Sequence, residues 1–82
     1  KVLHNAVCRE HIIMKVGNGP ASRQPVIEIA NLFRAKVVNV AESRLMLELT
    51  GEPEKIDSFI GLLQPYGVKE IVRTGISALE RD

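Results

Sequence analysis

The stretch KVVNVAESRLMLELT, residues 36–50, decides the fold of this chain. Residues 36–41 form a run rich in valine, in which Val38 and Val40 share one face. Residues 44–50 alternate, with leucine at positions 45, 47 and 49 on one face, which predicts a strand that buries one side. Because only Glu42 and Ser43 separate the two strands, we expect them to form an antiparallel hairpin.

A helical pattern lies on each side of this hairpin. In the first helix, Ser22 is the expected N-cap and Pro25 lies in the first turn, where its missing N–H is tolerated. In the second, Pro53 stands at the start, and Pro65 and Gly67 mark the end. Both helices carry apolar residues at the spacing i, i+3, i+4 and i+7, namely Val26, Ile29, Ala30 and Phe33, then Ile56, Phe59, Ile60 and Leu63. These stripes predict that both helices cover the same face of a sheet.

Two outer strands complete the pattern. Residues 10–17 alternate, with Ile12, Met14 and Val16 on one face. Residues 68–75 form the last strand, whose inward face is ambiguous because Ile71 and Val72 are adjacent. The order β-α-β-β-α-β predicts an α+β domain of ferredoxin-like arrangement, with a four-stranded antiparallel sheet and two helices on one face. Residues 1–9 have no clear period and are interpreted as an arm or linker, so the predicted domain spans residues 10–82, with residues 76–79 as a short extension.

The composition argues against several classes of function. The chain has 82 residues, enough for one domain. Its 11 basic and 10 acidic residues leave a net charge of +1, so no attraction for nucleic acid or an anionic membrane is expected. No apolar run approaches the roughly 20 residues of a membrane span. The single cysteine, Cys8, excludes an internal disulfide and fits a reducing compartment. All three aromatic residues fall on or after the predicted helices, so the sheet lacks the stacking platform of RNA-recognition domains.

Three residues near the N-terminus, His4, Cys8 and His11, are metal ligands by type. Their spacing matches no common zinc pattern, and no fourth ligand is obvious. Cys8 beside a histidine also suggests a nucleophile, but neither an orienting residue nor an oxyanion device is identifiable. A metal carrier therefore remains an alternative, against an arm with incidental polar residues.

Two other polar groups are candidate sites. Ser22 and Arg23 lie at a helix N-terminus, where an anion can bind, although the preceding loop lacks the glycine patterns of phosphate-binding loops. Glu48, Glu70 and Arg73 form either a polar site on the sheet or ordinary surface ion pairs. We assign no residue to catalysis, to a cofactor or to a metal.

The sheet face away from the helices is more apolar than a free surface requires. The expected alternation places Ile13, Val37 and Met46 on it, with Ile71 as a further candidate. An apolar face of this kind indicates a contact surface, so these residues are the candidate interface. A small domain is also only modestly stable alone, and we expect a homodimer through this face or through the edge strands.

Four segments, in order, resemble the C-terminal domain of the small, regulatory subunit of acetohydroxyacid synthase (acetolactate synthase). They are Arg9–Val16 for the opening strand, Leu32–Val40 for the helix-to-strand junction, Leu49–Gly51 followed by Lys55–Phe59 for the turn into the second helix, and Val68–Gly75 with Ala78 and Leu79 for the last strand and tail. The resemblance runs from about Arg9 to the C-terminus. The Gly-Asn-Gly-Pro-Ala-Ser-Arg segment and Pro65 are local variations in loops.

The resemblance implies a non-catalytic domain. The family's small subunit binds the catalytic large subunit, raises its activity and confers feedback inhibition by branched-chain amino acids, chiefly valine. Catalysis, thiamine diphosphate, magnesium and flavin belong to the large subunit. The effector site is attributed mainly to an N-terminal ACT domain, which we do not expect within this chain, so no residue here is assigned to valine. The implied location is the cytoplasm, or the plastid in a plant. The alternative is a stand-alone ferredoxin-like module that binds a small molecule such as an amino acid.

Overall fold

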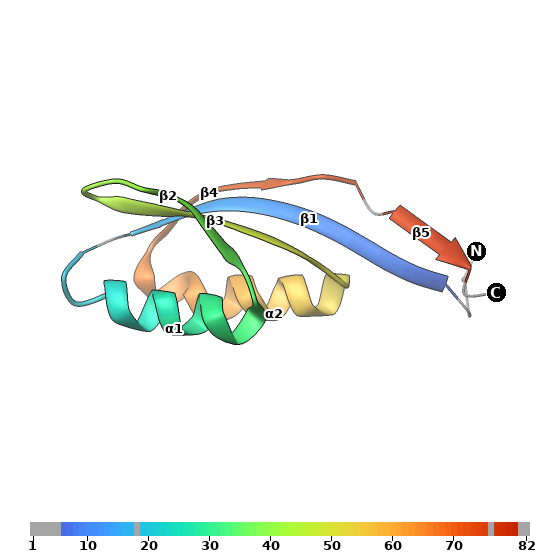
Figure 1. Ribbon diagram of the computed structural model, residues 1–82, viewed down its shortest axis with the longest axis horizontal. Coiled ribbons are helices and arrows are strands. Elements are labelled where there is room, and N and C mark those ends of the chain that lie inside the picture. The colour runs from blue at the N-terminus through green and yellow to red at the C-terminus, as the bar shows by residue number, and fades with distance from the viewer. Residues whose placement is uncertain (1–5, 18, 76, 81–82) are drawn as a thin grey trace.

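The computed structural model describes residues 6–17, 19–75 and 77–80. The elements in chain order are β1 (Ala6–Gly17), α1 (Arg23–Phe33), β2 (Lys36–Val40), β3 (Arg44–Gly51), α2 (Pro53–Leu63), the 3-10 helix η1 (Gln64–Tyr66), β4 (Val68–Arg73) and β5 (Ser77–Glu80). The strands form an antiparallel sheet in the order β2-β3-β1-β4. Both helices lie on one side of this sheet (Figure 1). The predicted ferredoxin-like fold is confirmed.

The core lies between the sheet and the two helices. Phe59 of α2 is completely buried, and its ring lies 5.2 Å from that of Phe33 on α1, a distance typical of favourable tilted aromatic pairs. The stripes predicted for the helices face this core, and so do the alternate residues of β1 and β3. The buried apolar residues are Ile12, Met14, Val16, Val26, Ala30, Leu45, Leu47, Leu49, Ile56, Phe59 and Leu63.

Two close contacts fix the ends of elements. The N–H of Gly17 donates to the carbonyl of Gly67 at 2.9 Å, and a Cβ added at Gly17 would lie 2.7 Å from the carbonyl oxygen of Tyr66. Only glycine therefore fits where the end of β1 lies against the end of η1. At the end of α1, Arg34 adopts the left-handed conformation and Ala35 donates to the carbonyl of Ala30 at 2.8 Å, which turns the chain into β2.

The strand β1 is longer than the sequence indicated. Residues 6–9, interpreted as an arm or linker, continue β1 and pair with Ser77–Glu80 of β5. This pair, which we call the β1–β5 ribbon, extends past the ends of both helices (Figure 1). Residues 1–5 of the predicted arm lie outside the described residues.

In β2 and β4, the residues that face each side of the sheet also differ from the expectation. Val37 lies opposite the buried Leu47 and therefore on the helix side of the sheet, not on the open side. The register of β2 against β3 shifts between Val37 and Asn39, and such a bulge changes which residues share a face. On β4, Ile71 lies opposite the buried Met14, so Val72 takes the open side.

Candidate functional site: the open face of the sheet

The side of the sheet away from the helices, here called the open face, is built from alternate residues of neighbouring strands. Residues directly opposite each other in an antiparallel pair share a face. Ile13 of β1 lies opposite Glu48 of β3 and Val72 of β4. Lys15 lies opposite Met46 and Glu70 in the next row. The open face therefore has mixed character, with apolar and charged side chains interleaved.

Two of the three predicted interface residues lie together on this face. Ile13 and Met46 occupy adjacent rows of the neighbouring strands β1 and β3, and both are partly buried. Val72 joins them and is 61 % exposed. Val37, the third predicted residue, lies on the edge strand and on the helix side. The apolar part of the open face is thus Ile13, Met46 and Val72, because the bulge in β2 moves Val37 away.

The charges on the open face are paired with one another. His11 and Glu48 approach to 2.7 Å between Nε2 and Oε2. Lys15 Nζ lies 3.0 Å from Glu70 Oε1, and Arg44 Nη1 lies 3.9 Å from the same oxygen. The hydrogen bond from Lys15, with the positive charges of Lys15 and Arg44, lowers the pKa of the Glu70 carboxyl. Charges already paired within one surface do not require matching charges on a partner.

The open face is hollowed on its β2–β3 side. A depression of about 190 Å³ is lined by Lys15, Asn39, Ala41, Arg44 and Met46. It is smaller than the pockets that usually enclose a drug-sized ligand. A protein side chain is a better match to its size than a cofactor.

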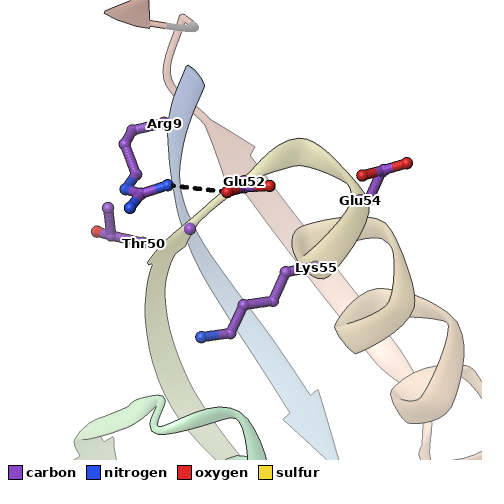
Figure 2. A pocket seen from close by; sticks show the side chains of 6 residues that line it. Arg9, Thr50, Glu52, Glu54 and Lys55 are labelled. Carbon is purple, nitrogen blue, oxygen red and sulfur yellow. Dashed lines mark ion pairs between the residues drawn. The ribbon is translucent and has the colours of Figure 1, made fainter. Parts of the chain in front are cut away.

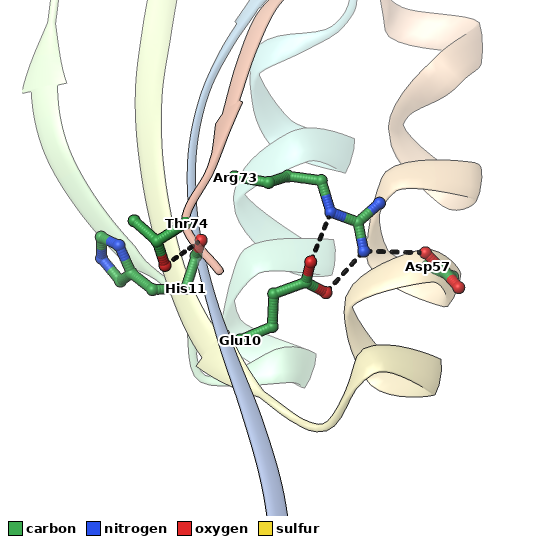
Figure 3. Close-up of polar contacts among 5 residues, drawn as sticks. All are labelled: Glu10, His11, Asp57, Arg73 and Thr74. Carbon is green, nitrogen blue, oxygen red and sulfur yellow. Dashed lines mark hydrogen bonds and ion pairs between the residues drawn. The ribbon is translucent and has the colours of Figure 1, made fainter. Parts of the chain in front are cut away.

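A second cluster lies on the helix side and was not predicted. Arg73 donates two hydrogen bonds to the carboxylate of Glu10, from Nε to Oε2 at 2.9 Å and from Nη2 to Oε1 at 2.5 Å (Figure 3). Its Nη2 also donates to Oδ1 of Asp57 on α2 at 3.2 Å. Glu10 is buried, with 7 % of its surface exposed. The hydrogen bonds from Arg73 lower the pKa of the Glu10 carboxyl, against the opposing effect of burial. The sequence did contain a signal, because Glu10 is in phase with Ile12 and Met14 and an inward carboxylate needs a partner.

The three residues proposed as one polar group are therefore separated. Glu48 pairs with His11 and Glu70 with Lys15 on the open face. Arg73 points to the helix side, toward Glu10 and Asp57. The three residues take part in three separate contacts, so they do not form one polar site on the sheet.

A charged hollow lies where β3 ends and α2 begins. It has a volume of about 430 Å³ and is lined by Arg9, Thr50, Gly51, Glu52, Glu54 and Lys55 (Figure 2). Arg9 Nη1 lies 3.5 Å from Glu52 Oε2. Two cations and two carboxylates around an open hollow do not define one class of ligand.

The other candidate sites are not assembled. Cys8 and His11 are separated by three positions along β1, so their side chains leave the strand on opposite faces, and His4 lies outside the described residues. Within residues 6–17, 19–75 and 77–80, no three metal-ligating side chains come together. Ser22 stands at the predicted N-cap of α1, but its hydroxyl bonds to the backbone of Gly19 and not to the helix. No helix in the described part of the chain is both long enough and apolar enough to cross a membrane.

Comparison with known proteins gives one consistent result. A family model described as the small subunit of acetolactate synthase matches residues 9–82. Acetolactate synthase small subunits from Mycolicibacterium smegmatis and Bacillus subtilis are 43 % identical over 77 residues and 44 % identical over 75 residues. These matches cover 94 % and 92 % of this chain, and 45 % and 44 % of the relatives.

A solved structure shows the same similarity in three dimensions. The crystal structure of the acetolactate synthase small subunit from Thermotoga maritima has a TM-score of 0.87 and 36 % identity, and the match covers 94 % of this chain and 47 % of that one. This chain thus spans about half the length of the relatives it matches. It belongs to the family of acetolactate synthase small subunits, whose C-terminal domain it resembles in sequence.

Proposed function

We propose that this chain is a non-catalytic regulatory domain that binds the catalytic large subunit of acetolactate synthase and supports its activation and feedback control. The observation that carries the proposal is the family match over residues 9–82. Relatives that share about two residues in five with this chain are named small subunits of that enzyme, and a small subunit implies a large one. Catalysis, with thiamine diphosphate, magnesium and flavin, is assigned to the large subunit, in branched-chain amino acid biosynthesis.

The open face is the contact surface in this proposal. Ile13, Met46 and Val72 supply apolar area, and the neighbouring carboxylates have partners within the face, Glu48 with His11 and Glu70 with Lys15. A surface of apolar side chains within paired charges is less costly to remove from water than one with isolated charges. Regulation by such a module requires only that it bind two states of its partner with different affinity.

The test uses the complete gene product that carries this sequence, mixed with the catalytic subunit from the same source. We expect acetolactate production to rise on mixing and to fall again when valine is added. An enzyme that responds neither to the added protein nor to valine would refute the proposal. Calorimetry of this chain alone with valine, leucine and isoleucine tests the amino-acid-binding alternative, which clear binding would favour.

A pair of substitutions tests the surface. Met46→Glu places a carboxylate beside Ile13 on the open face, and we expect it to weaken the complex. Leu62→Glu is the matched control, because Leu62 is 50 % exposed on α2, on the opposite side of the sheet. If Leu62→Glu weakened binding and Met46→Glu did not, the contact would lie on the helix side.

Homodimerisation is a separate part of the proposal. The open face and the exposed edge strands offer surfaces on which a second copy can pack, and a small domain gains stability from such a contact. Sedimentation velocity should show a dimer at high micromolar concentration. A monomer at that concentration would exclude it.

A further inference from the structure

The β1–β5 ribbon leaves the body of the domain beyond the helices, with an ion pair from Arg9 to Glu52 at the start of α2. Along β1, pairing with β3 ends at Glu10 and pairing with β4 ends at Ile12, so Ala6–Arg9 pair only with β5. The ribbon extends past both helices (Figure 1). An isolated two-stranded ribbon is marginally stable in water. Its direction must therefore be set at its root, where β1 and β4 leave the four-stranded sheet.

The root of the ribbon is braced by polar contacts on both of its strands. On the backbone, the N–H of Thr74 donates to the carbonyl of His11 at 2.9 Å, and its hydroxyl donates to the same oxygen at 3.2 Å. On the helix side, the two-point hydrogen bond from Arg73 to Glu10 joins the last residue of β4 to β1. The second contact of Arg73, with Asp57, continues to α2 (Figure 3). One guanidinium thus connects three elements at the root.

The burial of Glu10 makes this contact hard to replace. Within residues 8–17 and 19–75, Glu10 is the one buried charged side chain. A buried carboxylate that loses its cation must either reach water or take up a proton. Because Glu10 is part of β1 at the root, reaching water requires the root to open. The cluster on the open face differs, since Glu70 is 61 % exposed and is solvated already.

We propose that Arg73, Glu10 and Asp57 form a latch that fixes the direction in which the β1–β5 ribbon leaves the domain. With the latch closed, the ribbon and α2 move as one body. With the latch open, the ribbon bends more easily at its root, where β1 leaves β3 and β4 at residues 10–12 and where residues 74–75 connect β4 to β5. A partner that holds the ribbon would then be connected to α2 more rigidly when the latch is closed than when it is open.

The test measures the position of the ribbon relative to α2. Two nitroxide labels are attached in a Cys8→Ser background, at Arg9→Cys on the ribbon and at Ser58→Cys on α2, both exposed positions. Pulsed electron resonance should give one narrow distance peak. Arg73→Gln removes the cation at similar size, and we expect this narrow peak to be lost.

Two further variants keep the result decisive. Glu70→Gln breaks the ion pair on the opposite face of the same strand, and it should leave the peak narrow. A narrow peak in folded Arg73→Gln, or equal broadening in Glu70→Gln, would overturn the latch. If circular dichroism shows that Arg73→Gln does not fold, Asp57→Ala decides, because it removes only the exposed contact to α2. Broadening in that variant supports the latch, and an unchanged peak overturns it.

Discussion

Replacing Phe59 by alanine should remove a large part of the stability of this domain. The side chain is completely buried and its ring contacts that of Phe33, so the substitution loses the transfer free energy of the ring and leaves a cavity between the two helices. Substitutions of this kind cost about 3–5 kcal/mol. At about 0.05–0.15 kcal/mol per residue, a chain of 82 residues has a total stability of about 4–12 kcal/mol.

Urea denaturation followed by far-ultraviolet circular dichroism is the appropriate assay, because the chain has no tryptophan. With a slope of about 1–1.5 kcal/mol per molar urea for a domain of this size, the midpoint should fall by at least about 2 M. Leu62→Ala is the matched control on the same helix, since Leu62 is 50 % exposed, and it should cost less than about 1 kcal/mol. A shift for Phe59→Ala no larger than that of the control would refute the packing described here.

Three other predictions concern individual positions. Gly17→Ala should destabilise the domain by about 1–3 kcal/mol in the same urea assay, because its Cβ would meet the carbonyl oxygen of Tyr66; unchanged stability would mean that β1 does not approach η1 so closely. Gly61→Ala should raise the free energy of unfolding by about 0.5–1 kcal/mol, because Gly61 lies inside α2 with open space around it, and a loss of stability would contradict this. The pKa of Glu10 is lowered in the folded state. The stability that its ionised carboxylate contributes to the fold is therefore complete above the unfolded pKa of about 4.3, and it is lost as the pH falls through the folded pKa. Stability should therefore fall with acidification, and less steeply in Glu10→Gln; equal slopes would argue against the ion pair.

The features that repeat along the sequence were predicted correctly, since they follow from a single period. Leucine at alternate positions of β3 and the i, i+3, i+4, i+7 stripes of α1 and α2 are enough to indicate which faces meet in the core. The short connection between β2 and β3 makes them a hairpin, and the order β-α-β-β-α-β then indicates the ferredoxin-like topology. Most of the fold can therefore be predicted from local sequence patterns.

The errors arose where the outcome depends on pairing between distant segments. Val37 and Val40 share the helix side although they are three residues apart, because a bulge adds one residue, and neither valine signals the bulge locally. The partner of Glu10 is 63 residues away at Arg73, so no short motif joins them. Residues 6–9 form a strand that extends past the helices (Figure 1), and their sequence lacks the alternation that would have identified a strand.

The bulge in β2 also bears on how this domain behaves at high concentration. All five residues of β2 are exposed along the edge of the sheet, three of them valine. A regular edge of this composition would accept the edge strand of another molecule, and such pairing promotes aggregation. The extra residue at Val38 interrupts the even spacing of backbone groups that edge-to-edge pairing needs. The irregularity that moved Val37 off the open face thus also protects this edge against unwanted pairing, and deleting one residue there should remove the protection.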